Sequence, residues 1–175
     1  MRKLLVALAV VTFAVLAAAA AAGRHHAVGR VSVPGRLSIR VPVGWHVLRG
    51  WLSDVTDPAP RFAMASFPAR LSRHTCECGS PNVVNFPRDG AFVFVWENLR
   101  PSHRQLAQAP RRPTRFALAA GRGVRLTCDG PNGGFYFKDA GRVFQVEVYI
   151  GPKSSQVLRG RVAAMLESLR VPPDA

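Results

Sequence analysis

The fold is decided by residues 133–171, which read GGFYFKDAGRVFQVEVYIGPKSSQVLRGRVAAMLESLRV. Residues 135–137 are aromatic, and from Phe144 to Ile150 every second side chain is apolar, which is the period of a half-buried strand. Residues 138–142 predict a turn between the two segments, with Gly141 taking the positive φ that such loops need. This stretch therefore predicts a β-hairpin.

A helix is predicted directly after the hairpin. Gly151 and Pro152 end the second strand, and Ser154 or Ser155 can cap a helix by accepting a hydrogen bond from a backbone N–H. Five apolar residues then fall on one stripe of this helix: Leu158, Val162, Met165, Leu166 and Leu169. Charged residues fall elsewhere on it: Arg159, Arg161, Glu167 and Arg170. We expect the stripe to pack on one face of the hairpin's sheet.

The rest of the chain is expected to extend that sheet. Alternating or apolar runs predict a short helix at residues 102–108 and strands at 36–41, 61–67, 91–96, 115–118 and 124–128. Both alternating sets are apolar in residues 91–96, as in a central strand covered on both faces. We therefore expect an α+β fold, a single antiparallel sheet of about six or seven strands covered by the C-terminal helix. One domain would span residues 36–171, after a flexible N-terminus or edge strand at 23–35 and before a tail at 172–175.

The N-terminus predicts export from the cytoplasm. Arg2 and Lys3 precede an apolar run from Leu4 to Leu16 and a series of alanines ending at Ala22, the pattern of a signal peptide over residues 1–22. The alternative is an uncleaved N-terminal anchor, because the uncharged run is just long enough to span a bilayer as a helix. In both cases we expect the domain outside the cytoplasm, either secreted or held at the cell surface.

The chain is strongly basic. It has 24 Lys and Arg against 10 Asp and Glu, a net charge of +14, and losing Arg2 and Lys3 with the signal peptide would leave +12. Such an excess attracts polyanions, which outside a cell are anionic lipids, cell-wall polymers or stray nucleic acid. No block of five like charges is present, so we expect no specific nucleic-acid binding. The alternative is a solvated basic surface with no dedicated partner, on a monomeric protein.

Three cysteines follow the predicted signal peptide: Cys76, Cys78 and Cys128. An exported chain meets oxidising conditions, so we expect one disulfide from Cys76 or Cys78 to Cys128 and one spare thiol. The alternative is a thiol-redox or soft-metal site at His74, Cys76 and Cys78, because histidine and thiolate ligands suit copper(I) or zinc. A structural zinc site would need a fourth ligand, from His103 or Cys128.

No catalytic motif is present in the sequence. The chain lacks G-x-S-x-G, H-E-x-x-H, the GxxxxGK[ST] phosphate loop and GxGxxG, and its acidic residues form no close pair of the kind that glycosidases use. We therefore expect a non-catalytic binding or assembly module without a cofactor.

Two short motifs carry a family resemblance. Residues 37–45 read LSIRVPVGW, a strand with a P-x-G-W end, and residues 166–171 read LESLRV at the end of the predicted helix. In this the chain resembles small secreted proteins of high-GC bacteria and, more distantly, the PsbP-like α/β/α sandwich. The resemblance implies a non-catalytic fold used for binding or assembly, and it assigns no functional residue.

Overall fold

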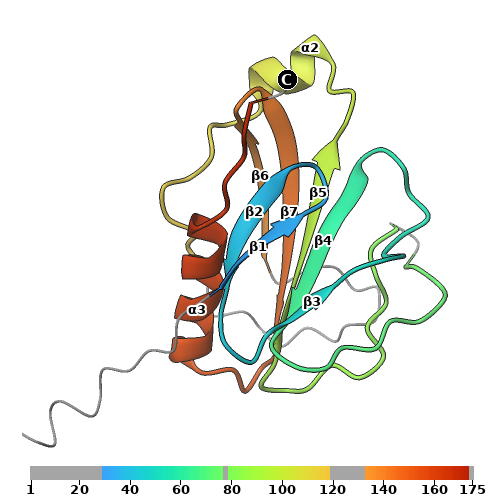
Figure 1. The fold of residues 1–175 in the computed structure, drawn as a ribbon, viewed down its shortest axis with the longest axis vertical. Helices are drawn as coiled ribbons and strands as arrows, with labels where there is room; N and C mark the ends of the chain where they lie inside the picture. The colour runs from blue at the N-terminus through green and yellow to red at the C-terminus, as the bar shows by residue number, and fades with distance from the viewer. Residues whose placement is uncertain (1–28, 77–78, 119–132, 174–175) are drawn as a thin grey trace, which may run out of the picture.

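The structure, a computed structural model, describes residues 29–76, 79–118 and 133–173. These ranges contain two helices and seven strands (Figure 1). In chain order they are β1 (Gly29–Val33), β2 (Leu37–Val41), β3 (His46–Leu48), β4 (Ala59–Ala65), β5 (Ala91–Asn98), α2 (His103–Gln108), β6 (Gly133–Asp139), β7 (Arg142–Ile150) and α3 (Gln156–Glu167). The predicted α+β class is confirmed.

Five strands form the main antiparallel sheet, in the order β3-β4-β5-β7-β6. β5 is the middle strand, as predicted, and it pairs with β7 from Ala91 opposite Ile150 to Asn98 opposite Val143. The predicted hairpin is β6–β7, and its turn consists of Ala140 and Gly141, with φ values of 50° and 80°. Both are left-handed, which suits the twist of a tight hairpin.

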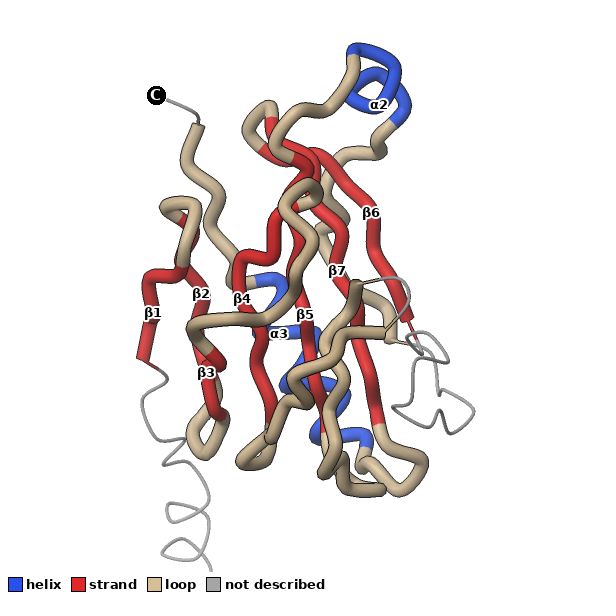
Figure 2. The backbone as a smooth tube through the Cα atoms, turned by 90° about the vertical axis from the view of Figure 1, so that its right-hand side faces the viewer, coloured by secondary structure: helices blue, strands red, loops and turns tan. Residues whose placement is uncertain are grey.

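The prediction of a single sheet with six or seven strands is wrong. β1 and β2 pair only with each other among the named strands and form a separate two-stranded antiparallel sheet. This hairpin buries one side, made of Val33, Leu37, Ile39 and Val41, in the same apolar cluster as Phe144 and Val146 of the main sheet. It therefore covers a face of the main sheet together with α3 instead of extending an edge (Figures 1 and 2). A strand that extends the edge of a sheet and a hairpin that packs on its face show the same alternation of apolar and polar side chains. The sequence therefore could not distinguish the two arrangements.

Helix α3 begins and packs as predicted. The Ser155 side chain accepts a hydrogen bond from the N–H of Leu158 at 3.1 Å, so Ser155 is the N-cap. From the predicted stripe, Val162, Met165, Leu166 and Leu169 are buried against the main sheet and the β1–β2 hairpin, and Leu158 is partly buried. Arg159, expected off the stripe, is also buried.

The other face of the main sheet is covered by irregular chain. Ala63, Ala65, Phe92, Phe94, Trp96 and Tyr149 point to this side and form a second apolar cluster with Leu52 and Val83. Phe67, Leu71 and Phe86 from the segment after β4 pack against it. Figure 2 shows α3 on one side of the strands and irregular chain on the other. Because both faces are covered, β5 is buried from Ala91 to Glu97.

Three smaller expectations have different outcomes. The short helix predicted at 102–108 is confirmed as α2, which has a capping box between Ser102 and Gln105. The strand predicted at 115–118 is wrong, since those residues are irregular, while the one at 124–128 and the signal peptide at 1–22 lie outside the described residues. Of the helices within the described ranges, neither is long and apolar enough to cross a membrane.

Candidate anion-binding surface

The chain that follows α3 is bonded to the outer edge of β2. The N–H of Arg170 donates to the carbonyl oxygen of Ser38 at 2.8 Å, and the N–H of Ser38 donates back to Arg170 at 3.2 Å. The N–H of Arg40 donates to the hydroxyl oxygen of Ser168 at 2.8 Å. These bonds bring the C-terminal Arg170 beside residues near the start of the domain.

Three arginines meet at this junction: Arg30, Arg40 and Arg170, here called the arginine cluster. Arg30 and Arg40 are directly opposite each other across β1 and β2, and all three are exposed. Partial desolvation, followed by repulsion from Arg170 and Arg40, lowers the pKa of the Arg30 guanidinium. Arg40 and Arg170 are therefore both close enough to Arg30 to repel its charge.

Hydrogen bonds hold Arg30 in place despite this repulsion. Its Nη1 donates to the carbonyl oxygen of Ser38 at 3.2 Å, to the Ser38 hydroxyl at 3.1 Å and to the carbonyl oxygen of Ser168 at 3.1 Å. The guanidinium thus joins the β1–β2 hairpin to the end of α3. No such bond fixes the head groups of Arg40 and Arg170 within the described part of the chain.

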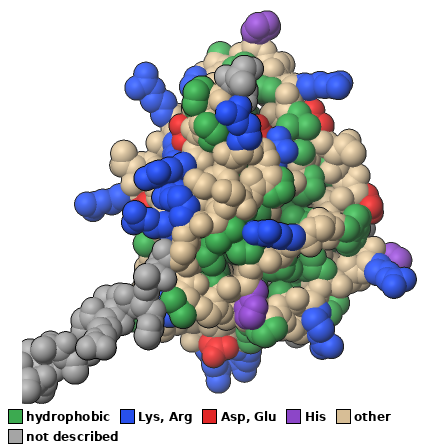
Figure 3. Space-filling view, in the orientation of Figure 1, with side chains coloured by type: hydrophobic (Ala, Val, Ile, Leu, Met, Phe, Trp, Pro, Cys, Tyr) green, Lys and Arg blue, Asp and Glu red, His purple; other side chains and the backbone are tan. Residues whose placement is uncertain are grey.

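Among the residues that the structure describes, no carboxylate forms an ion pair with the cluster. The ion pairs within the described ranges are Arg61–Glu97, Arg142–Glu97 and Arg112–Asp139, and none of them includes a cluster arginine. In Figure 3, Lys and Arg side chains gather where the end of α3 meets the β1–β2 hairpin. Among the described residues, the cluster therefore carries three positive charges without an ion-paired carboxylate.

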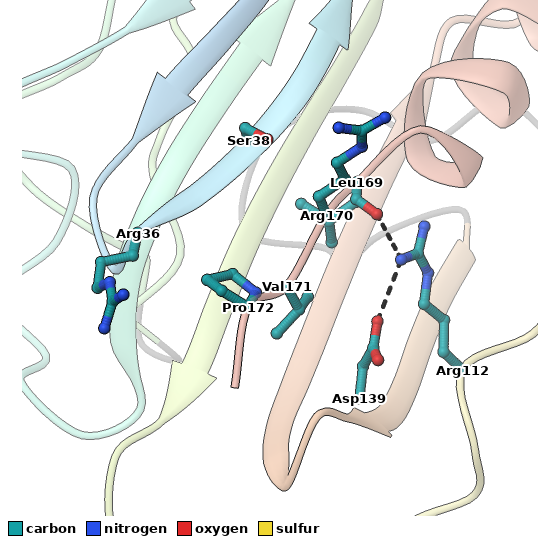
Figure 4. A pocket seen from close by; sticks show the side chains of 8 residues that line it. All are labelled: Arg36, Ser38, Arg112, Asp139, Leu169, Arg170, Val171 and Pro172. Carbon is teal, nitrogen blue, oxygen red and sulfur yellow. Dashed lines mark hydrogen bonds and ion pairs between the residues drawn. The ribbon is translucent and has the colours of Figure 1, made fainter. Parts of the chain in front are cut away.

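An open groove of about 560 Å³ adjoins the cluster (Figure 4). Arg36 and Ser38 line one side, the segment from Leu169 to Pro172 crosses it, and Arg112 and Asp139 lie on the other side. Arg112 is occupied, because it pairs with Asp139 at 3.1 Å and donates to the carbonyl oxygens of Leu166, Glu167 and Leu169 at the end of α3. Arg36 and Arg170 are the lining cations left to contact a ligand.

The cysteine site predicted from the sequence falls partly outside the described residues. His74 is exposed and Cys76 is buried, with 6% of its surface accessible, whereas Cys78 and Cys128 lie outside the described ranges. His103, the possible fourth ligand, is exposed at the start of α2. Within the described part, no three His, Cys, Asp or Glu side chains are grouped so that they could hold a metal ion. Both the disulfide and the metal site stay predictions.

Sequence reasoning missed the arginine cluster as a site. The strand prediction at 36–41 placed Arg36, Ser38 and Arg40 on one side, which was a usable signal. Nothing in the sequence indicated that Arg170 pairs beside Ser38 or that Arg30 faces Arg40.

Comparisons with known proteins identify no family for this chain. No family model matches the chain, and neither a curated protein nor a solved structure is significantly similar to it. The PsbP-like resemblance therefore stays a prediction.

Proposed function

We propose that this protein is an extracytoplasmic, non-catalytic binding module that holds an extended polyanion, such as an anionic cell-wall polymer, through its arginine cluster. The observation that carries the proposal is the convergence of Arg30, Arg40 and Arg170 with no acidic partner among the described residues. Gathering like charges costs free energy, and a bound anion removes that cost. A solvated basic surface without a ligand would gain no free energy from placing these three arginines together.

The shape of the surface favours a polymer over a single small anion. Arg36 lies in the turn directly before β2 and Arg40 lies in β2, so their Cα atoms are at most about 13 Å apart. The open groove lies at the Arg36 end, and Arg30 and Arg170 flank the strand further along. A chain with repeated anionic groups can contact these cations in succession, since guanidinium groups pair well with phosphate and carboxylate.

Salt-dependent retention on heparin tests the proposal, with heparin as a model polyanion. The test variant is Arg40→Gln with Arg170→Gln, which removes two charges and keeps the hydrogen bonds of Arg30. The matched control is Arg73→Gln with Arg104→Gln, two exposed arginines of the irregular segment after β4 and of α2. We expect the cluster variant to weaken binding at least tenfold and the control less than threefold, and both affinities to fall with salt.

Two outcomes would contradict the proposal. Equal weakening by the two double variants would mean that net charge alone attracts the polyanion. Binding to vesicles containing phosphatidylglycerol, without retention on heparin, would replace the polymer with a membrane surface. Circular dichroism of each variant checks that the fold is unchanged, so that a lost contact is not confused with unfolding.

A further inference from the structure

A second cavity, separate from the arginine cluster, lies between the end of β1, strand β3 and the start of β4. Its volume is about 280 Å³. The walls are largely apolar and include Val33, Pro34, Val47, Leu48, Leu52 and Phe62. Ligand sites for drug-sized molecules usually span about 300–1,000 Å³, so this cavity suits a smaller molecule.

A charged group lies in this apolar lining. The lining contains two arginines: Arg49, which is exposed, and Arg61, whose Nε donates to Oε2 of Glu97 at 2.5 Å. The same carboxylate is also held by Arg142, whose Nε and Nη2 donate to its two oxygens at 2.6 Å each. Two guanidinium groups thus share one carboxylate, which leaves one positive charge in excess.

The excess charge is accessible at Arg61. The Arg142 side chain is only 5% exposed and also donates to the carbonyl oxygen of Gly35 at 2.9 Å, whereas the Arg61 side chain is 18% exposed. Within the described residues, Glu97 is the one hydrogen-bond partner of the Arg61 side chain, through Nε. No buried side-chain nitrogen or oxygen in that part of the chain lacks a partner, so the terminal nitrogens of Arg61 must reach accessible space.

We propose that this cavity binds a small monocarboxylate with an apolar body of roughly six to eight carbons. The carboxylate pairs with the two terminal nitrogens of Arg61, which offer a planar fork of donors. The body packs on Phe62, Leu52 and Val47. A monoanion matches the single excess charge of the Arg61–Glu97–Arg142 group, and the apolar walls select against small hydrophilic anions.

Titration with octanoate, followed by the methyl NMR signals of Val47, Leu48 and Leu52, tests this site. We expect saturable shifts at these methyl groups with a dissociation constant near the millimolar range, as for a ligand of about ten heavy atoms. Octan-1-ol, which has no charge, should bind at least tenfold more weakly. Arg61→Gln should weaken octanoate at least tenfold while Arg142 still pairs with Glu97, and Arg73→Gln, which changes the net charge equally at a distant exposed position, should have no effect.

A filling variant keeps the test valid if Arg61→Gln unfolds the protein. Val47→Trp occupies the cavity and leaves Arg61 and Glu97 in place, so it should abolish the shifts at Leu48 and Leu52. The inference is overturned if octanoate shifts these methyl groups equally in the wild type and in the folded Val47→Trp variant. It is also overturned if no saturable shift occurs up to about 10 mM, well above the expected constant.

Discussion

Glu147 offers the sharpest test of the packing. It lies on β7, on the face covered by irregular chain, and only 5% of its surface is exposed. Its Oε2 accepts from the hydroxyls of Ser80 and Tyr149, each at 2.9 Å, and its Oε1 accepts from Trp96 Nε1 at 3.0 Å and Gln145 Nε2 at 3.3 Å. No ion pair within the described residues includes it. Within the described part of the chain, the donors that stabilise this buried carboxylate are all neutral.

Two substitutions separate the hydrogen bonds from the charge. In Glu147→Gln the remaining carbonyl oxygen can still accept from Trp96, and the new amide can donate to the Ser80 and Tyr149 hydroxyls, which rotate to accept. We expect its free energy of unfolding to lie within about 1 kcal/mol of the wild type. Glu147→Leu keeps a similar volume but removes every acceptor.

The expected magnitude follows from the donors that lose their acceptor. The Trp96 N–H can only donate, so leaving it unpaired in the core costs about 1–3 kcal/mol. The Ser80 and Tyr149 hydroxyls also lose the acceptor that they share, and each lost hydrogen bond costs about 0.5–1.5 kcal/mol. Both variants remove the cost of burying a charge, so the comparison between them cancels that contribution. We expect Glu147→Leu to be less stable than Glu147→Gln by about 2–5 kcal/mol.

Urea unfolding followed by tryptophan fluorescence and circular dichroism measures this difference. With a slope near 1.5 kcal/mol per molar urea, a loss of about 3 kcal/mol lowers the midpoint by about 2 M. Gln145→Ala is the control, because Gln145 is exposed and water can replace its bond, so it should change stability by less than about 0.5 kcal/mol. Equal stability of the Glu147→Leu and Glu147→Gln variants would refute the reasoning that the hydrogen bonds of this side chain stabilise the irregular chain packed on the sheet.

Two further predictions concern the end of α3 and the cysteines. Arg112→Met removes the donors to the last carbonyl groups of α3 and the ion pair with Asp139, so it should lower the free energy of unfolding by about 2–3 kcal/mol in the same urea assay, while Arg111→Met at the neighbouring exposed position should have little effect. For the three cysteines, the intact mass of the exported protein should show one alkylated thiol before reduction and three after it; three alkylated thiols before reduction would contradict the predicted disulfide.

The elements that could be predicted are those that carry their own local signals. The β6–β7 hairpin has alternation on its strands and Gly141 in its turn, and α3 has a cap at Ser155 and an apolar stripe. The irregular segment at 115–118 contains Phe116, which is buried against Phe135 and Phe137 and so looked like part of a strand. The Phe116 side chain packs on the sheet, but the backbone of residues 115–118 does not pair with a strand.

The partners of the strands could not be predicted in the same way. Gln145, Glu147 and Tyr149 alternate with apolar residues, which suggested a solvent-facing side for β7. Only the fold shows that the chain after β4 returns over this side and brings Ser80 to Glu147. The arginine cluster depends on similar long-range pairing, because Arg170 reaches Ser38 through the path of α3.

Both proposed sites depend on the β1–β2 hairpin. The carbonyl oxygen of Gly35, in the turn of this hairpin, accepts a hydrogen bond from Arg142. A Cβ at Gly35 would lie 2.9 Å from Nε of Arg61, so the turn needs a glycine to pack this closely on the two arginines. On the other side, Arg170 and Ser168 bond to β2 through backbone and hydroxyl groups. These attachments are made by groups that do not depend on the head groups of Arg40 and Arg170. The hairpin can therefore keep its position while the exposed head groups of Arg40 and Arg170 repel Arg30, and a bound polyanion would relieve that repulsion.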